Sequence, residues 1–289
     1  MIHRPRRVAA AALVLTAGFL LQGCELSQEE KAALSSGTVN AVDENNLNDI
    51  MLTLADSPAA VEYYRRALGR EPERLDLKRG YALSLARDRQ HAEARLVFDD
   101  LVAKGGAQPA DLVVFARSLA MLDDFEAAAA TLDRLPAGYA SARDQQLRGM
   151  IADHHRDWPA ADAYYDTARK LTAQPAPIYN NIGVSKMARG DMAGAEQAFR
   201  QALIHDPRMF EAKNNLALSY ALQKQYRIPV ISLTEEERAI LLHNIALVAL
   251  RQGDETVAVG LLQQSVKIHP RHWAPAAEKL ATLQDRVKG

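Results

Sequence analysis

Apolar and small residues recur along this chain at helical spacing, and the arrangement repeats about every 34 residues. A small residue, an alanine, an aromatic ring and a second alanine each return at that interval. These pairs are Gly149 and Gly183, Ala161 and Ala195, Tyr165 and Phe199, and Ala168 and Ala202. Small residues let two helices cross closely, and an aromatic ring four positions after an alanine lies on the same helical face. A period of this length predicts stacked helix pairs.

The same arrangement extends in both directions and predicts an all-α solenoid of about seven units. The small position of each first helix is assigned, after an irregular Asn48, to Gly80, Ala116, Gly149, Gly183, Ala217 and Ala246. The alanine of each second helix is assigned to Ala60, Ala92, Ala128, Ala161, Ala195 and Ala258. The large residue four positions later is assigned to Tyr64, Leu96, Leu132, Tyr165, Phe199 and Leu262. Pro72, Pro207 and Pro270 follow three of the units, where a proline would end a helix.

The unit from Ile178 to Pro207 resembles the tetratricopeptide-repeat family. Residues in the family's positions are Tyr179, Ile182, Gly183, Ala195, Phe199, Ala202 and Pro207. Lys186 departs from the family pattern, which prefers a large apolar residue there. The resemblance covers residues 44–270 and implies a right-handed superhelix whose first helices line a concave groove.

The sixth unit interrupts this pattern. Pro229 lies where its second helix should hold a small residue, within the β-branched run Ile228–Leu233. A proline in a helix interior costs about 3 kcal/mol, so we expect a shortened helix or an irregular crossing. Thr234 and Glu237 have the spacing of a capping box and predict a new helix. The interruption is either a tolerated change of length between repeats or a kink that shapes the groove.

The C-terminal residues 271–289 predict a helix that caps the solenoid. From Trp273 to Val287 one side carries apolar residues and the other carries charges. The expected buried side consists of Ala277, Leu280, Ala281 and Leu283, with Trp273 also buried.

The N-terminus has the features of a secretory signal. Arg4, Arg6 and Arg7 precede an apolar run, Val8–Leu21, that is short for a membrane span. The following residues, Leu21-Gln22-Gly23-Cys24, resemble a bacterial lipobox, although Gln22 departs from its commonest pattern. An ordinary secretory signal without lipid attachment is the alternative.

The lipobox implies removal of residues 1–23 and attachment of acyl chains, including palmitate, to Cys24. Cys24 is the only cysteine in the chain, so no thiol remains for a disulfide, a metal or a nucleophile. Acyl chains on this cysteine would anchor the protein without a spanning helix. Residues 24–43 are mainly polar and predict a flexible tether. Glu25, in place of an aspartate retention signal, implies an outer-membrane lipoprotein that faces the periplasm.

Charge and motifs argue against nucleic-acid binding and against catalysis. Removing Arg4, Arg6 and Arg7 leaves 32 basic and 36 acidic residues, a weakly acidic balance. The sequence contains no phosphate-binding loop, dinucleotide fingerprint or nucleophile elbow, and no cofactor is expected. The densest titratable cluster is Asp153-His154-His155, but adjacent side chains on a helix point about 100° apart, so no zinc site is expected. An enzyme with a cryptic site at Asp153 and His154 remains the alternative class.

Resemblance to the repeat family also implies which residues line the groove. In the family these lie three positions before the small residue and one and four positions after it. The corresponding residues are Gln146, Met150 and Asp153; Asn180, Val184 and Met187; Asn214, Leu218 and Ala221; and His243, Leu247 and Leu250. Asparagine would suit the backbone of an extended peptide, and the apolar residues would suit an amphipathic helix. The next residues, Asn181, Asn215 and Asn244, match a family position that favours asparagine for architectural reasons.

The chain as a whole resembles the TadD-type lipoproteins of Tad/Flp pilus assembly. This resemblance rests on the lipobox, the tether, about seven repeats and the run Thr234 to Arg238. It implies a non-catalytic scaffold that assists an outer-membrane secretin or other pilus components. The alternative is an adaptor lipoprotein for a periplasmic protease, a cell-wall synthase or an outer-membrane assembly machine.

Overall fold

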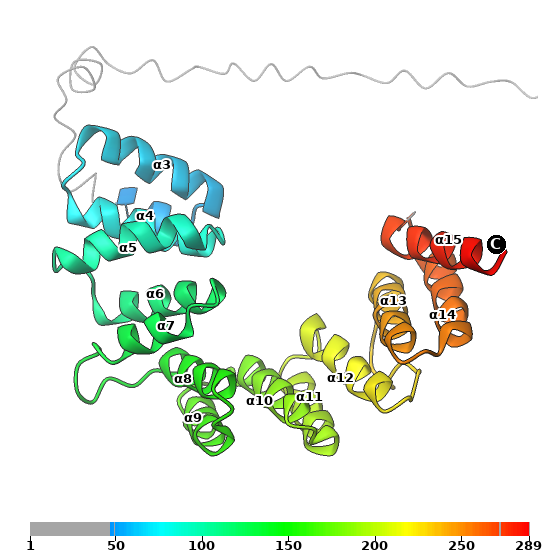
Figure 1. The fold of residues 1–289 in the computed structure, drawn as a ribbon. Helices are drawn as coiled ribbons and strands as arrows, with labels where there is room; N and C mark the ends of the chain where they lie inside the picture. The colour runs from blue at the N-terminus through cyan, green and yellow to red at the C-terminus, as the bar shows by residue number, and fades with distance from the viewer. Residues whose placement is uncertain (1–46, 49, 272, 289) are drawn as a thin grey trace, which may run out of the picture. The chain divides into compact units, whose positions relative to one another are not determined.

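A computed structural model describes residues 47–48, 50–271 and 273–288. Contacts divide the chain into two units, Met1–Ile50 and Met51–Gly289. The predicted signal sequence, Cys24 and the tether lie outside the described residues. In the described part of Met51–Gly289, every regular element is an α-helix, as the periodicity predicted (Figure 1).

Helices alternate between the first and second members of successive pairs. The first helices are α4 (Leu75–Arg87), α6 (Pro109–Met121), α8 (Ala142–His154), α10 (Ala176–Ala188), α12 (Phe210–Leu222) and α13 (Glu235–Arg251). The second helices are α3 (Ser57–Arg70), α5 (His91–Ala103), α7 (Phe125–Leu132), α9 (Trp158–Lys170), α11 (Met192–His205) and α14 (Glu255–Ile268). A final helix, α15 (Ala274–Lys288), packs on α14. We number the units so that unit two is α4 with α5, and unit seven is α13 with α14.

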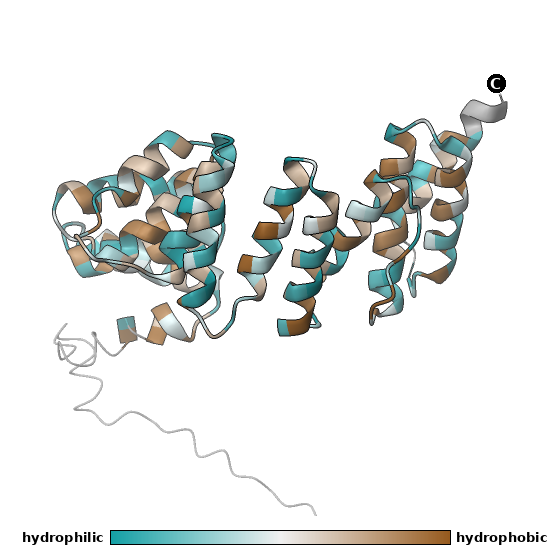
Figure 2. Ribbon diagram, turned by 90° about the horizontal axis from the view of Figure 1, so that it is seen from below, coloured by the Kyte–Doolittle hydropathy of each residue, from teal (hydrophilic) through white to brown (hydrophobic). Residues whose placement is uncertain are grey.

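First helices pack on one another as well as on their own partners. Helices α4, α6, α8, α10 and α12 each contact the first helix of the next unit. Second helices of the described units make no comparable contact with each other. Because the first helices lie closer together, they form the inner side of a curved stack, as expected for a superhelical solenoid. Hydrophobic and hydrophilic positions alternate around these helices (Figure 2).

Close crossings within units four and five depend on glycine. A Cβ atom on Gly149 would lie 2.7 Å from the Tyr165 ring, and one on Gly183 would lie 2.4 Å from the Phe199 ring. Both rings are almost fully buried. The small residue of the first helix therefore makes room for the aromatic residue of the second.

Unit two lies two residues out of the register that we assigned from the sequence. Ala94 and Phe98 are completely buried, whereas Ala92 is exposed and Leu96 is 70% exposed. The packing pair of α5 is therefore Ala94 with Phe98. This correction makes the spacing more regular, since Ala94 stands 34 residues after Ala60 and 34 before Ala128.

Gly80 accordingly does not occupy the small position of unit two. A Cβ on Gly80 would lie 2.3 Å from the ring of Tyr64, which belongs to α3 in the preceding unit. Ala82 is fully buried and precedes Ala94 by twelve residues, the spacing that separates Gly183 from Ala195. The sequence pattern was misassigned because a glycine marks a close approach without indicating which neighbour approaches.

The turns that follow the first helices support this register. Each contains one residue with positive φ, seven positions after the small residue. These residues are Arg89, Asp123, Arg156, Gly190, Lys224 and Gly253. Three of these residues are followed directly by an aspartate that caps the second helix of its own unit. Asp124, Asp157 and Asp191 accept hydrogen bonds of 2.9–3.2 Å from the backbone N–H three residues later.

An irregular segment replaces the second helix of unit six, as the proline predicted. After α12 the chain has no helix until Glu235. Ile231 packs on the cluster of Phe199, Leu216 and Tyr220, while Ile228 packs on the C-terminal apolar cluster. Residues 223–233 therefore cover α12 without forming a helix.

The predicted capping box starts α13. The Thr234 hydroxyl accepts from the Glu237 N–H at 3.1 Å, and the Glu237 carboxylate accepts from the Thr234 N–H at 2.9 Å. Glu237 also receives two hydrogen bonds from the Lys213 ammonium at 2.9 and 3.0 Å. Lys213 is a buried residue of α12, so this ion pair joins the two helices across the interruption.

Helix α15 caps unit seven with a slightly different face from the one expected. Leu283 and Ala276 are buried against the C-terminal cluster and Leu280 packs beside them, but Ala281 is exposed. Trp273 is half-buried, and its ring lies 4.9 Å from His243 and 5.5 Å from His269 between centroids.

Candidate functional site

The residues expected to line the groove lie on the first helices of units four to seven, and we call this surface the inner face. Val184 is 41% exposed, and Asn180 is only 9% exposed. Of the other ten expected residues, Ala221 is completely buried in the core and so does not line the groove. The remaining nine are partly exposed: Gln146, Met150, Asp153, Met187, Asn214, Leu218, His243, Leu247 and Leu250. The His243 ring is partly covered by Trp273 of the C-terminal cap.

Asparagine side chains join successive first helices. Asn215 donates from Nδ2 to Oδ1 of Asn180 at 2.9 Å, and Asn244 donates to Oδ1 of Asn214 at 2.7 Å. The two pairs occupy the same repeat positions. The accepting asparagine lies three positions before the small residue of its unit, and the donating asparagine lies two positions before the small residue of the next unit. The amide oxygens of Asn180 and Asn214 thus stabilise the stack, and a ligand would have to compete for them.

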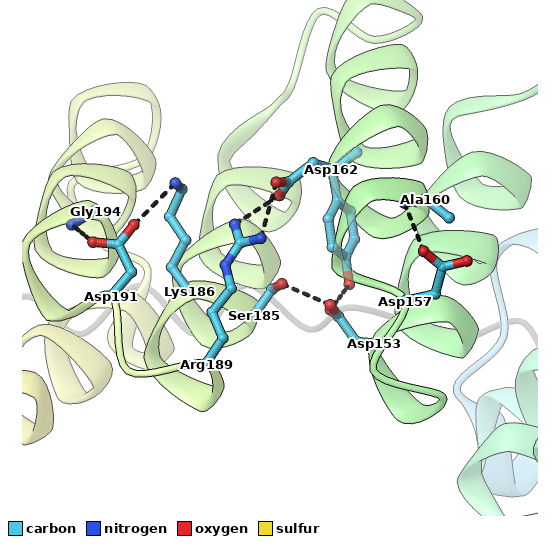
Figure 3. Close-up of polar contacts among 10 residues, drawn as sticks. Asp153, Asp157, Ala160, Asp162, Ser185, Lys186, Arg189, Asp191 and Gly194 are labelled. Carbon is cyan, nitrogen blue, oxygen red and sulfur yellow. Dashed lines mark hydrogen bonds and ion pairs between the residues drawn. The ribbon is translucent and has the colours of Figure 1, made fainter.

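Asp153 connects three helices. Its Oδ1 accepts from the Ser185 hydroxyl of α10 at 2.6 Å, and its Oδ2 accepts from the Tyr165 hydroxyl of α9 at 2.7 Å (Figure 3). Burial raises the pKa of Asp153, and burial together with the nearby Asp153 carboxylate raises the pKa of Tyr165. Asp153 is therefore a bridging residue between units four and five.

We predict that Asp153→Asn reduces the pH dependence of stability. A raised pKa means that the folded state binds the proton more tightly than the unfolded state. The wild-type chain therefore gains stability as the pH falls through the folded pKa, and this gain is complete below the unfolded pKa. An asparagine can accept one hydroxyl hydrogen bond and donate another, so Asp153→Asn should be tolerated at neutral pH. Urea unfolding from pH 3 to pH 7 measures this; equal slopes for both proteins would contradict it.

The histidines next to Asp153 do not converge with it on a metal. The His154 ring stacks on Phe125 at 3.9 Å, and the His155 ring is turned by 84° from that of His154. Among the described residues, no group of three histidine, cysteine, aspartate or glutamate side chains could hold a metal ion.

A cavity of about 690 Å³ lies between the turns of units four and five. It is lined by Asp153, His154, Arg156, Trp158, Ala188, Arg189 and Gly190. The Arg189 guanidinium is already held by both carboxylate oxygens of Asp162 at 2.8 and 2.9 Å (Figure 3). Since Asp153 is also hydrogen-bonded within the protein, two charged groups of the cavity are occupied.

The inner face presents a row of aliphatic side chains. Val184, Leu218 and Leu247 each follow the small residue of their unit by one position, on α10, α12 and α13. None of the three belongs to the apolar clusters formed by the described residues, and all three retain exposed surface. Met150 holds the same position in unit four but packs partly on the core. We call Val184, Leu218 and Leu247 the aliphatic row.

A sequence model of the tetratricopeptide-repeat family matches residues 52–109 and 180–226. Both segments are thus similar to tetratricopeptide repeats. The second segment contains the crossing of Gly183 with Phe199 and the capping Asp191 described above. The chain therefore has the fold of a tetratricopeptide-repeat solenoid.

Solved structures of tetratricopeptide-repeat proteins have the same fold. A repeat protein from Parabacteroides merdae is 15% identical and gives a TM-score of 0.55 over 83% of this chain and 96% of its own. A chain of the Cut9–Hcn1 complex is 19% identical and gives a TM-score of 0.56 over 88% of this chain and 51% of its own. These similarities establish the fold only.

Among curated proteins, cellulose synthase operon protein C of Pseudomonas fluorescens is 29% identical over 151 residues. The match covers 52% of this chain and 11% of that protein, so the chain spans only a small part of that relative's length.

The helices in the described ranges lack the length and apolar composition of a membrane-spanning segment.

Two bridging residues were missed in the sequence, although a periodic signal existed for one of them. Ser185 follows Asp153 by 32 residues, nearly one repeat, and a polar pair at that interval indicates contact between successive first helices. Lys213 gave no such signal, because its partner Glu237 was already explained by the capping box.

Proposed function

We propose that this repeat protein is a lipid-anchored scaffold of the outer membrane that faces the periplasm and holds a protein partner on its inner face. The observation that carries this proposal is the aliphatic row of Val184, Leu218 and Leu247, whose side chains retain exposed surface. The helices that hold this row are joined to their neighbours by hydrogen bonds and by a close glycine crossing. Such a rigid, partly apolar surface suits binding with little loss of conformational entropy. The scaffold acts without catalysing a reaction.

The lipid anchor rests on the lipobox-like Leu21-Gln22-Gly23-Cys24 and on Cys24 being the only cysteine. Three acyl chains on one cysteine would each contribute about 0.8 kcal/mol per buried methylene, enough for stable attachment. We expect Cys24→Ser to move the protein from the membrane pellet to the soluble fraction. Helix content and melting temperature should stay unchanged, because Cys24 precedes the predicted repeats, residues 44–270. A variant that remains in the pellet after a carbonate wash would contradict the anchor.

Within this role, we infer that the partner belongs to the Tad/Flp pilus assembly system. The resemblance to TadD-type lipoproteins supports this, and the partner would be an outer-membrane secretin or another pilus component. Deleting the gene should abolish surface pili and reduce assembled secretin multimers, and the wild-type gene should restore both. Normal pili in the deletion strain would exclude this assignment while leaving the scaffold role intact.

A second candidate is an adaptor for another envelope machine, such as a periplasmic protease, a cell-wall synthase or an outer-membrane assembly machine. The partial similarity to cellulose synthase operon protein C favours keeping this alternative. Neighbouring genes separate the two, because pilin, secretin and secretion-ATPase genes would adjoin this gene only in a pilus system.

A further inference from the structure

We propose that the contact between His243 and Trp273 is an acid-sensitive latch, which holds the C-terminal cap on unit seven and releases it when the His243 imidazole takes up a proton. The cap consists of Trp273 and helix α15. The inference concerns this end of the solenoid alone and does not depend on the proposed function. It rests on three rings that meet there, on one buried nitrogen and on the charges around it.

The indole of Trp273 links the cap to both helices of unit seven. Its centroid lies 4.9 Å from that of the His243 ring of α13, with an interplanar angle of 61°. It lies 5.5 Å from the ring of His269, which directly follows α14, with an angle of 15°. Helix α15 itself packs on α14. The edge-on contact with His243 therefore joins the cap to the first helix of the unit.

One nitrogen of His243 is buried without a hydrogen-bond partner. None of the described residues pairs with its Nδ1 atom, which is almost inaccessible to solvent. A neutral imidazole can leave one nitrogen as an unprotonated acceptor, whereas an imidazolium carries an N–H at both nitrogens. Protonation would therefore place an unpaired N–H and a positive charge inside this contact, and burying such groups is costly.

The surroundings of His243 do not compensate for a proton. Burial lowers the pKa of His243, and the ammonium of Lys279 on α15 lowers it further. Among the described residues, no charged group of α12 or α14 acts on this pKa, and no carboxylate raises it. The other described imidazole beside the indole is His269, whose Nδ1 lies 2.5 Å from the backbone oxygen of Arg271. Protonated His269 can donate to that oxygen, so its proton is satisfied where that of His243 is not.

Acid therefore favours the open cap. In the closed cap the pKa of His243 is lowered, whereas an exposed imidazole has the ordinary value of about 6.5. The closed state is fully favoured above that ordinary pKa, and its advantage is lost as the pH falls through the lowered pKa. A pKa lowered by one would raise the ratio of open to closed caps about tenfold in acid.

The architecture of the solenoid allows the cap to open by itself. A repeat unit contacts only its neighbours, so one end can open while the other units stay packed. Ala276 and Leu283 of α15 are buried against the C-terminal apolar cluster. Release would uncover part of this cluster together with His243, which the sequence placed on the inner face. The latch therefore makes the C-terminal end of the inner face sensitive to pH.

Quenching of Trp273 fluorescence by acrylamide tests this inference in the full chain. The chain has two tryptophans, and Trp158→Phe leaves Trp273 as the single reporter. Between pH 7.5 and pH 5 the quenching constant should rise about twofold or more, with a midpoint below about 6.5. Helix content by circular dichroism should stay nearly constant, because the helix pairs remain packed. A quenching constant that does not change with pH would overturn the inference.

Three substitutions in this background separate the latch from a general effect of acid. His243→Gln cannot be protonated and should remove the rise in quenching. Its matched control, His269→Gln, changes the other imidazole at the same indole and should keep the rise. Lys279→Glu places a carboxylate where an ammonium now disfavours the imidazolium, so the rise should become smaller.

Each variant also has an outcome that contradicts the latch. A full rise in His243→Gln would overturn it, as would loss of the rise in His269→Gln. If the cap of His243→Gln were already open at pH 7.5, Lys279→Glu would decide, because an unchanged rise in that variant would overturn the inference.

Discussion

Gly183→Val should lower the free energy of unfolding by about 2–3 kcal/mol. The new Cβ would lie 2.4 Å from Cε1 of Phe199, and that ring is completely buried, so it cannot move aside without displacing its neighbours. Overpacking of this kind typically costs about 1–3 kcal/mol. Urea denaturation followed by circular dichroism measures the change.

Gly260→Ala is the matched control for this substitution. Gly260 also lies within a helix, α14, but nothing would lie within 4 Å of its added Cβ. Alanine there should stabilise the protein by about 0.5–1 kcal/mol, because it favours the helix more than glycine does. Phe199→Leu should partly rescue Gly183→Val, since the two side chains compete for one space. Gly183→Ala, made for direct comparison, should destabilise the protein; if it stabilised the protein as Gly260→Ala does, the close crossing would play no special role.

Glu237→Ala should destabilise the protein by about 3–5 kcal/mol. The Lys213 side chain is only 6% exposed, so its ammonium would stay buried without an ionic partner. An unpaired buried charge costs more free energy than the loss of the whole ion pair. Glu237→Ala would also remove the carboxylate from the capping box of α13. Thermal and urea unfolding of the full chain would show the loss.

Lys213→Met is the matched control. Methionine removes the charge and fills similar space. The Glu237 carboxylate still accepts from the Thr234 N–H, and its side chain is 20% exposed, so water can solvate it. We expect a cost of about 1 kcal/mol, so the two halves of one ion pair should differ strongly. If both variants lost the same free energy of unfolding, the loss would come from the contact itself and not from an unpaired buried charge.

The pH dependence of this pair should be opposite in sign to that of Asp153. Burial alone would raise the pKa of Glu237, but hydrogen bonds from Lys213 and from the Thr234 N–H outweigh burial and lower it. The pair therefore contributes full stability above the unfolded pKa, and this contribution is lost as the pH falls through the folded pKa. Glu237→Gln should remove that acid sensitivity.

Local patterns were sufficient to predict the helix pairs of this protein. Alanine followed four residues later by a large apolar residue marked the buried face of five of the six second helices, and Thr234 with Glu237 marked the start of α13. Pro229 predicted a shortened helix or an irregular crossing in unit six, and the structure has the irregular segment. These patterns involve residues within one or two helical turns of one another, so they can be recognised without knowing which other helices pack nearby.

The register of unit two could not be read in this way. Gly80 and Ala82 are both small, and choosing between them required knowing that Tyr64 fills the space above Gly80. The same limit applies to the inner face. The sequence placed Asn180 and Asn214 there, but only the structure shows that their oxygens accept from asparagines of the next unit.

The sequence by itself determined that this chain forms stacked helix pairs, that three second helices end before Pro72, Pro207 and Pro270, that a helix starts after Thr234, and that one pair is incomplete. These properties depend on helical periodicity, capping and proline, which are local. The tertiary structure decided which polar side chains are consumed in holding the stack together and which aliphatic ones remain accessible. The reason is that hydrogen bonds such as Asn215 to Asn180 join residues one repeat apart, so they exist only after the units have packed.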